Sequence, residues 1–286
     1  MLSVRTGAVQ TFDWNKIKVT NAATWTGTTG LSPITLYTGP GLTLDNYDLL
    51  KWKSVTSDGK FEYGWRANVT TATPGTPTTI MNATQLFFDR NQFKGVDKTV
   101  TSVPPGNIAY GGLSTLGNTT TGNKLTLDSV YAVYAGNAYG GYTKAETGDS
   151  TGNELILKNG AYLGDVYNPG CIAAGGWAQN GDATNNTVTL SGNGGTSYDG
   201  TNLYGGWSGK SGADVKTGNR LRVTGKDSYG RSINNFEKME FELNSAVNSG
   251  DTMLSIRTGA VQTFDWRNVR VTGLRAWATA LAANNV

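Results

Sequence analysis

A unit of about 30 residues is written four times between residues 106 and 227, and this repeat constrains the fold more than any other feature. Each copy contains a Gly-Gly pair, and the residues that precede the pairs are Tyr110, Tyr139, Ala174 and Tyr204. Each copy then has a turn that ends in asparagine: Asn123, Asn153, Asn186 and Asn219. These asparagines are 30, 33 and 33 residues apart. Such a period predicts stacked units, none of which buries its apolar face alone.

A short apolar segment follows each asparagine and alternates strictly. In the first copy, Leu125 and Leu127 would face one side, and Lys124 and Thr126 the other. Period-two alternation in so short a run predicts a half-buried β-strand. Successive strands would stack in parallel about 4.8 Å apart. We therefore predict an all-β fold, a parallel β-helix or solenoid, with an array of antiparallel hairpins as the alternative.

The same model assigns roles to the repeated turn residues. The asparagine would take the left-handed turn conformation, and its amide would bond to the asparagines above and below it. The Gly-Gly pair would form a second corner, where Cβ atoms would crowd.

A second repeat relates the two ends of the sequence. Residues 1–20 and 253–272 differ at only five positions, all by mild changes, and the offset of 252 residues also places Trp25 on Trp277. We interpret the sequence as one module of about 252 residues followed by the first 34 residues of the next copy, cut from or belonging to a longer tandem array. We expect aromatic residues of the duplicated segment to form an end-to-end interface: Phe12, Trp14, Trp25, Phe264, Trp266 and Trp277.

The two repeats divide the sequence into four parts. Residues 1–105 are an irregular β segment with loops, which we interpret as wider coils or as an excursion from the stack. Residues 106–227 are the four-coil solenoid. Residues 228–252 form a hairpin-like closing segment or cap. Residues 253–286 begin the next copy and duplicate residues 1–34.

Composition excludes several chemistries. The absence of histidine removes Ser-His-Asp and Cys-His catalysis and His-ligated metals. The one cysteine, Cys171, forms no disulfide within the chain. A net charge of +3 is too small to predict binding to nucleic acid or to an anionic membrane. No apolar run approaches the ~20 residues of a membrane span. We expect no enzymatic activity, no cofactor and no metal.

Two sets of repeated side chains are candidate sites. Asp149, Asp182 and Asp214 recur in one turn and suggest a calcium ladder, although one carboxylate per coil is few for calcium. We favour hydrogen bonds to their own turns. Aromatic residues beside the glycine pairs would form a stripe for sugars or a partner if exposed, or ladder packing, which we favour, if inward. They are Tyr110, Tyr139, Tyr142, Trp177, Tyr204 and Trp207.

The order of several motifs between residues 106 and 272 carries a family resemblance. Among them are Tyr110-Gly-Gly, Gly122-Asn-Lys-Leu-Thr-Leu, Asn235-Phe-Glu and Gly250-Asp-Thr-Met-Leu. On these motifs the chain resembles the passenger regions of bacterial autotransporter adhesins. The resemblance implies a right-handed β-helix that is secreted, displayed on the bacterial cell surface and active in adhesion or aggregation.

From these observations we expect an extracellular structural or adhesive module of a large repetitive surface protein. Its rod would be stiff, and its repeated contacts would add by avidity. Its partners would be adjacent modules or other copies of itself, in a head-to-tail filament, and also glycans or proteins of host or bacterial surfaces. The alternative is a carbohydrate-binding or carbohydrate-cleaving β-helix, similar to tailspikes and lyases, whose cleft would gather Asp, Glu, Lys or Arg side chains.

Overall fold

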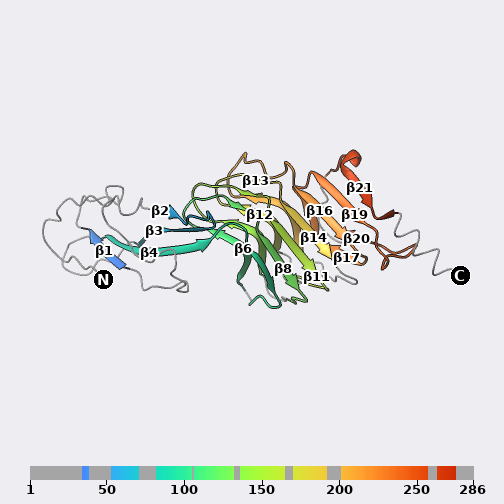
Figure 1. Cartoon of the computed structure of the whole chain (residues 1–286), viewed down its shortest axis with the longest axis horizontal. Helices are drawn as coiled ribbons and strands as arrows, with labels where there is room; N and C mark the ends of the chain where they lie inside the picture. The colour runs from blue at the N-terminus through green and yellow to red at the C-terminus, as the bar shows by residue number, and fades with distance from the viewer. Residues whose placement is uncertain are drawn as a thin grey trace. The chain divides into compact units, whose positions relative to one another are not determined.

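The computed structural model describes residues 34–38, 53–70, 82–104, 106–131, 136–164, 170–191, 201–256 and 263–274. They belong to two compact units, residues 1–92 and residues 93–286, and each unit is described by itself (Figure 1).

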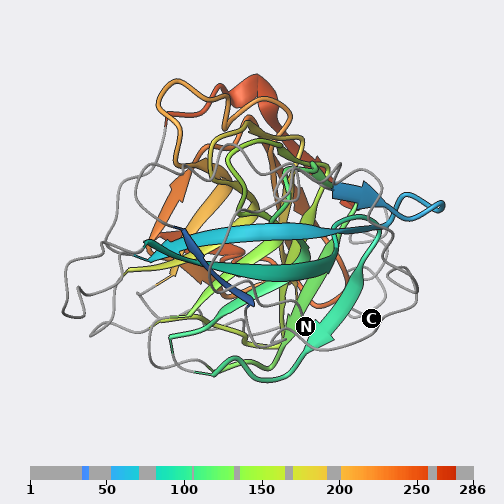
Figure 2. The ribbon, with the colours of Figure 1, turned by 90° about the vertical axis from the view of Figure 1, so that its left-hand side faces the viewer.

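The first unit contains a four-stranded antiparallel sheet. Its strands, in the order in which they pair, are β1 (Ile34–Thr38), β4 (Asn82–Gln92), β3 (Phe61–Thr70) and β2 (Lys53–Val55). The long pair β3 and β4 (Figure 2) runs from Phe61 opposite Gln92 to Thr70 opposite Ala83. The interpretation of this region as wider coils of the stack is wrong, because all the described ladders of this sheet are antiparallel.

The second unit is a parallel β-solenoid, as predicted. Its largest sheet has seven strands, which follow one another in chain order (Figure 1). They are β5 (Asp97–Val100), β8 (Lys124–Asp128), β11 (Glu154–Lys158), β14 (Thr187–Ser191), β16 (Arg220–Thr224), β19 (Lys238–Glu242) and β21 (Val269–Thr272). All pairs within this sheet are parallel, which rules out the hairpin array.

Smaller parallel sheets form the remaining walls of the solenoid. The five-stranded sheet consists of β6 (Ile108–Ser114), β9 (Asn137–Thr143), β12 (Cys171–Ala178), β15 (Thr201–Ser208) and β18 (Ser232–Asn234). The three-stranded sheet consists of β7 (Thr120–Thr121), β10 (Ser150–Thr151) and β13 (Ala183–Thr184). One further pair joins β17 (Ser228–Gly230) to β20 (Leu254–Ile256).

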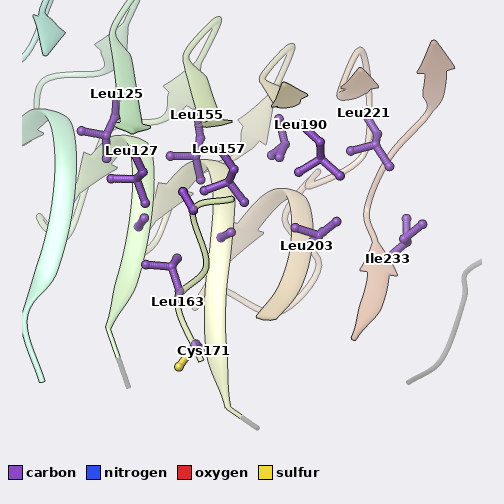
Figure 3. Close-up of a cluster of buried hydrophobic side chains, with 14 of the residues drawn as sticks. Leu125, Leu127, Leu155, Leu157, Leu163, Cys171, Leu190, Leu203, Leu221 and Ile233 are labelled. Atoms are coloured by element: carbon purple, nitrogen blue, oxygen red, sulfur yellow. The ribbon is translucent and has the colours of Figure 1, made fainter. Parts of the chain in front are cut away.

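The core lies between the seven-stranded and five-stranded sheets. The alternating strands place their predicted apolar residues inside, each at most 4% exposed: Leu125, Leu127, Leu155, Leu157, Val188, Leu190, Leu221 and Val223. Leu203 and Ile233 face them from the opposite wall (Figure 3). The parallel register stacks like on like, with Leu155 between Leu125 and Val188. Cys171 is a buried member of the same core.

The repeated asparagines form the predicted ladder at one interior corner, where each is at most 1% exposed. The Asn123 backbone N–H donates to Asn153 Oδ1 at 3.1 Å, and Asn153 and Asn186 repeat this bond toward the next coil at 3.0 and 2.8 Å. The left-handed conformation was assigned to the wrong residue. It is taken one position earlier, as at Gly122 (φ 62°) and Asn185 (φ 57°), because that residue makes the turn that directs the next side chain inward.

The glycine pairs lie within strands β6, β9, β12 and β15, and not at a corner as predicted. A Cβ on Gly175 would lie 2.7 Å from Asn186 Cβ and 2.9 Å from the carbonyl oxygen of Gly205. One on Gly176 would lie 2.6 Å from Asn186 Nδ2. The strand needs glycine here because it passes this close to the asparagine ladder and to the next coil.

The predicted boundaries of the solenoid are wrong at both ends. The second unit starts at Phe93, and β5 already belongs to the seven-stranded sheet, so the stack begins before residue 106. Within residues 228–252, β19 pairs in parallel with both β16 and β21. The segment is therefore a further coil rather than a hairpin, and it does not end the stack, because β20 and β21 continue it.

Candidate functional site

The six predicted aromatic residues gather in one cluster that is separate from the core. Ring centroids are 5.1 Å apart for Tyr139 and Tyr142, 4.7 Å for Tyr142 and Trp177, and 5.2 Å for Trp177 and Trp207, whose planes differ by 8°. Tyr139 and Tyr142 flank a glycine pair and still share one face of the sheet. The bent glycine segment therefore removes the alternation that an extended strand would impose.

Burial separates the cluster into two groups. Tyr139, Tyr142 and Trp177 are only 3%, 8% and 9% exposed, which fits ladder packing and leaves them little surface for a ligand. Burial also raises the pKa of Tyr139 and Tyr142. Tyr110, Tyr204 and Trp207 are partly buried, and for them ligand contact stays a prediction.

The repeated aspartates form a ladder of turns. Asp149 Oδ1 accepts from the Asp182 backbone N–H at 2.9 Å, and Asp182 Oδ1 accepts from the Asp214 N–H at 3.0 Å. Hydrogen bonds from Thr217 and from the Lys216 backbone lower the pKa of Asp214. Asp214 therefore bonds its own turn, as favoured, whereas Asp149 and Asp182 bond the turn of the next coil. Among the residues described, no group of three or more Cys, Asp or Glu side chains is placed to hold a metal ion.

The end of the solenoid carries the described members of the predicted end-to-end interface. Phe264 packs against the core, whereas Trp266 is 82% exposed on the short 3₁₀ helix η4 (Trp266–Asn268). Val271 on β21, the last of the described strands, is 47% exposed. The other members, Phe12, Trp14, Trp25 and Trp277, lie outside the described residues.

A groove that the sequence did not predict crosses the outer face of β16, β19 and β21. Its lining is Arg220, Lys238, Met239, Glu240, Arg267, Asn268 and Arg270. Glu240 lies 3.6 Å from the Arg220 guanidinium and 3.9 Å from that of Arg222. Arg267 pairs with Asp265 at 2.7 Å. Lys238 and Arg270 have no ion-pair partner among the described residues, so the groove keeps positive charge.

The sequence held a partial signal for this groove. Arg220 and Arg222 alternate outward on β16, and Arg267 and Arg270 recur in the duplicated segment. Only the register brings them together, because β19 places Lys238 beside Arg220 and Glu240 beside Arg270.

No family model, curated protein or solved structure matches the chain. The resemblance to autotransporter passenger regions therefore stays a prediction from the motifs. In the part of the chain that the structure describes, helices long and apolar enough to cross a membrane are absent.

Proposed function

We propose that the chain is a structural and adhesive module of an extracellular bacterial surface protein in which modules follow one another in tandem. One observation carries the proposal. The second copy of the duplicated segment continues the parallel stack, from Met239 opposite Val269 to Glu242 opposite Thr272. Residues 17–20 read Ile-Lys-Val-Thr where residues 269–272 read Val-Arg-Val-Thr. The first copy would therefore complete the same coil of a preceding module.

This arrangement defines a joining coil, residues 253–272, at the end of each solenoid. Its apolar residues Met253, Leu254, Ile256, Phe264 and Val269 pack against the core of the stack. The solenoid resists bending because its backbone ladders, asparagine ladder and core all run from coil to coil. An array of such modules gives reach and presents each surface many times, so weak contacts add by avidity.

A two-module chain, made by repeating residues 21–272 once, tests the tandem role. Electron microscopy should show two solenoids at one constant spacing, because a joined stack fixes the geometry between successive modules. A broad distribution of spacings would contradict the proposal. Particles coated with the two-module chain should also adhere to cells more strongly than particles coated with an equal mass of the single module.

The groove at the joining coil favours a second function, the binding of acidic glycans. Arginine guanidinium groups match carboxylate and sulfate oxygens with paired hydrogen bonds. Strand spacing places the backbones of paired cationic residues on neighbouring strands, such as Arg220 and Lys238, about 4.8 Å apart. Asp265, Glu240 and Glu242 lie among the cations, which disfavours the dense, continuous charge of nucleic acid.

Heparin binding tests this second function. The double variant Lys238→Gln, Arg270→Gln should weaken binding at least tenfold, because it removes the two unpaired cations. The matched control Lys144→Gln, Lys158→Gln removes the same charge elsewhere and should keep most of the affinity. Equal losses in both variants, or equally tight binding of single-stranded DNA, would indicate general attraction of polyanions and contradict a glycan site.

A further inference from the structure

The end of the solenoid is a two-ladder docking site that the joining coil fills. β20 pairs with β17, and β21 pairs with β19. Backbone bonds close the site at both edges: Ser228 N–H donates to Met253 O at 3.1 Å, and Leu243 N–H donates to Thr272 O at 2.9 Å. Main-chain ladders supply the affinity of such a site, and side-chain pockets supply its selectivity.

Residues 1–20 carry what this site recognises. At the five positions that pack against the core, the first copy has Met1, Leu2, Val4, Phe12 and Ile17, which are identical or similar apolar residues. Opposite Glu240, where β21 places Arg270, the first copy has Lys18. Residues 1–20 thus keep the apolar and the cationic residue types that residues 253–272 present to the docking site.

We propose that the end of the solenoid also binds residues 1–20 of a second copy of the chain, in place of its own residues 253–272. The inference rests on the proposed role of residues 253–272 as a joining coil. Each chain contains one docking end and one first copy of the duplicated segment, so the contact is heterologous and does not close on itself. Such contacts build open head-to-tail filaments.

In the unaltered protein, residues 253–272 of the same chain (the in-chain segment) occupy the docking site in preference to residues 1–20 of a second chain. The in-chain segment is tethered to β19 by a short connection, and short flexible tethers give effective concentrations on the order of millimolar. Residues 1–20 of a second chain, present at about 10 µM, compete poorly because this concentration is far below the effective concentration of the tethered segment. The chain should therefore be monomeric at micromolar concentration, and association should appear when the in-chain segment is weakened.

Two prolines weaken the in-chain segment selectively. Since Thr272 O accepts from Leu243 and successive residues of a strand face opposite neighbours, the N–H groups of Arg270 and Thr272 point toward β19. Arg270→Pro with Thr272→Pro removes both donors and gives the vacated variant. Lys18→Pro with Thr20→Pro is the matched change in the first copy, and the combined variant carries all four substitutions.

Sedimentation velocity from 5 to 100 µM compares the four full-length chains. The unaltered chain and the first-copy variant should sediment as monomers, the vacated variant should form growing oligomers, and the combined variant should return to monomers. A vacated variant that stays monomeric overturns the inference. Association of both the vacated and the combined variants also overturns it, because an exposed core end would then aggregate without the first copy.

Hydrogen exchange of the unaltered chain shows which proposal has failed: the exchange of segments between chains, or the role of residues 253–272 as a joining coil. If Arg270 and Thr272 exchange as fast as in a free peptide, the joining-coil role and the inference both fail. If these amides are protected and the vacated variant stays monomeric, only the exchange between chains fails.

Discussion

Asn153 occupies the middle of the asparagine ladder, and its replacement by alanine tests what holds successive coils together. Its Oδ1 accepts from the Asn123 backbone N–H at 3.1 Å and from Asn123 Nδ2 at 2.8 Å. Its Nδ2 donates to the carbonyl oxygen of Thr120 at 3.1 Å. The side chain is buried, so water cannot replace these partners.

The expected cost follows from these bonds. The Asn123 N–H would remain buried without an acceptor, which costs ~2 kcal/mol, and the two amide bonds contribute ~1 kcal/mol each. Asn153→Ala should therefore lower the free energy of unfolding by about 4 kcal/mol. That loss is a large part of the 5–15 kcal/mol typical of a folded domain.

Urea unfolding followed by circular dichroism measures this loss. Asn180→Ala is the matched control, because Asn180 is exposed in a turn of the same solenoid and should change stability by less than ~0.5 kcal/mol. A loss below ~1 kcal/mol for Asn153→Ala, similar to the control, would refute the view that the ladder joins the coils.

Two further predictions concern the glycine pairs and the buried tyrosines. Gly175→Ala should destabilise the chain by ~3 kcal/mol in urea unfolding, because the new Cβ would lie 2.7 Å from Asn186 Cβ. Gly170→Ala, whose Cβ would meet nothing within 4 Å, should cost less than ~0.5 kcal/mol. Burial raises the pKa of Tyr139 and Tyr142 above that of the unfolded chain, so the folded state holds protons that the unfolded state releases above pH ~10. The urea midpoint should thus fall as pH rises from 9 to 11, and less steeply in Tyr139→Phe; an equal slope would contradict this assignment.

The sequence predicts the features of the solenoid that repeat. Alternation identifies Leu125, Leu155, Val188 and Leu221 as one buried row, because a strand that is half buried has only one apolar face. The asparagine ladder follows from a fixed spacing and an amide that both donates and accepts. Both are local patterns that each coil repeats, so four copies reinforce one another.

Features that depend on how the backbone passes its neighbours are not visible in the sequence. The Gly-Gly pair looks like a corner, yet it lies within a strand. Glycine is needed there because the asparagine side chain of the same coil approaches the strand. Similarly, the groove between Arg220 and Arg270 exists only because β19 lies between β16 and β21 in one register. The antiparallel sheet of β1 to β4 has no internal repeat, so nothing in its sequence marks the change of architecture before Phe93.

The joining coil places β21 on β19, and amide hydrogen exchange at β21 measures whether this pairing is present in solution. The Arg270 and Thr272 amides face β19 and should exchange at least about 100-fold more slowly than the Val271 amide, which faces away from β19; that ratio corresponds to about 2.7 kcal/mol of protection. Fast and equal exchange at all three amides would show that β21 does not continue the stack, and the tandem proposal would then be wrong.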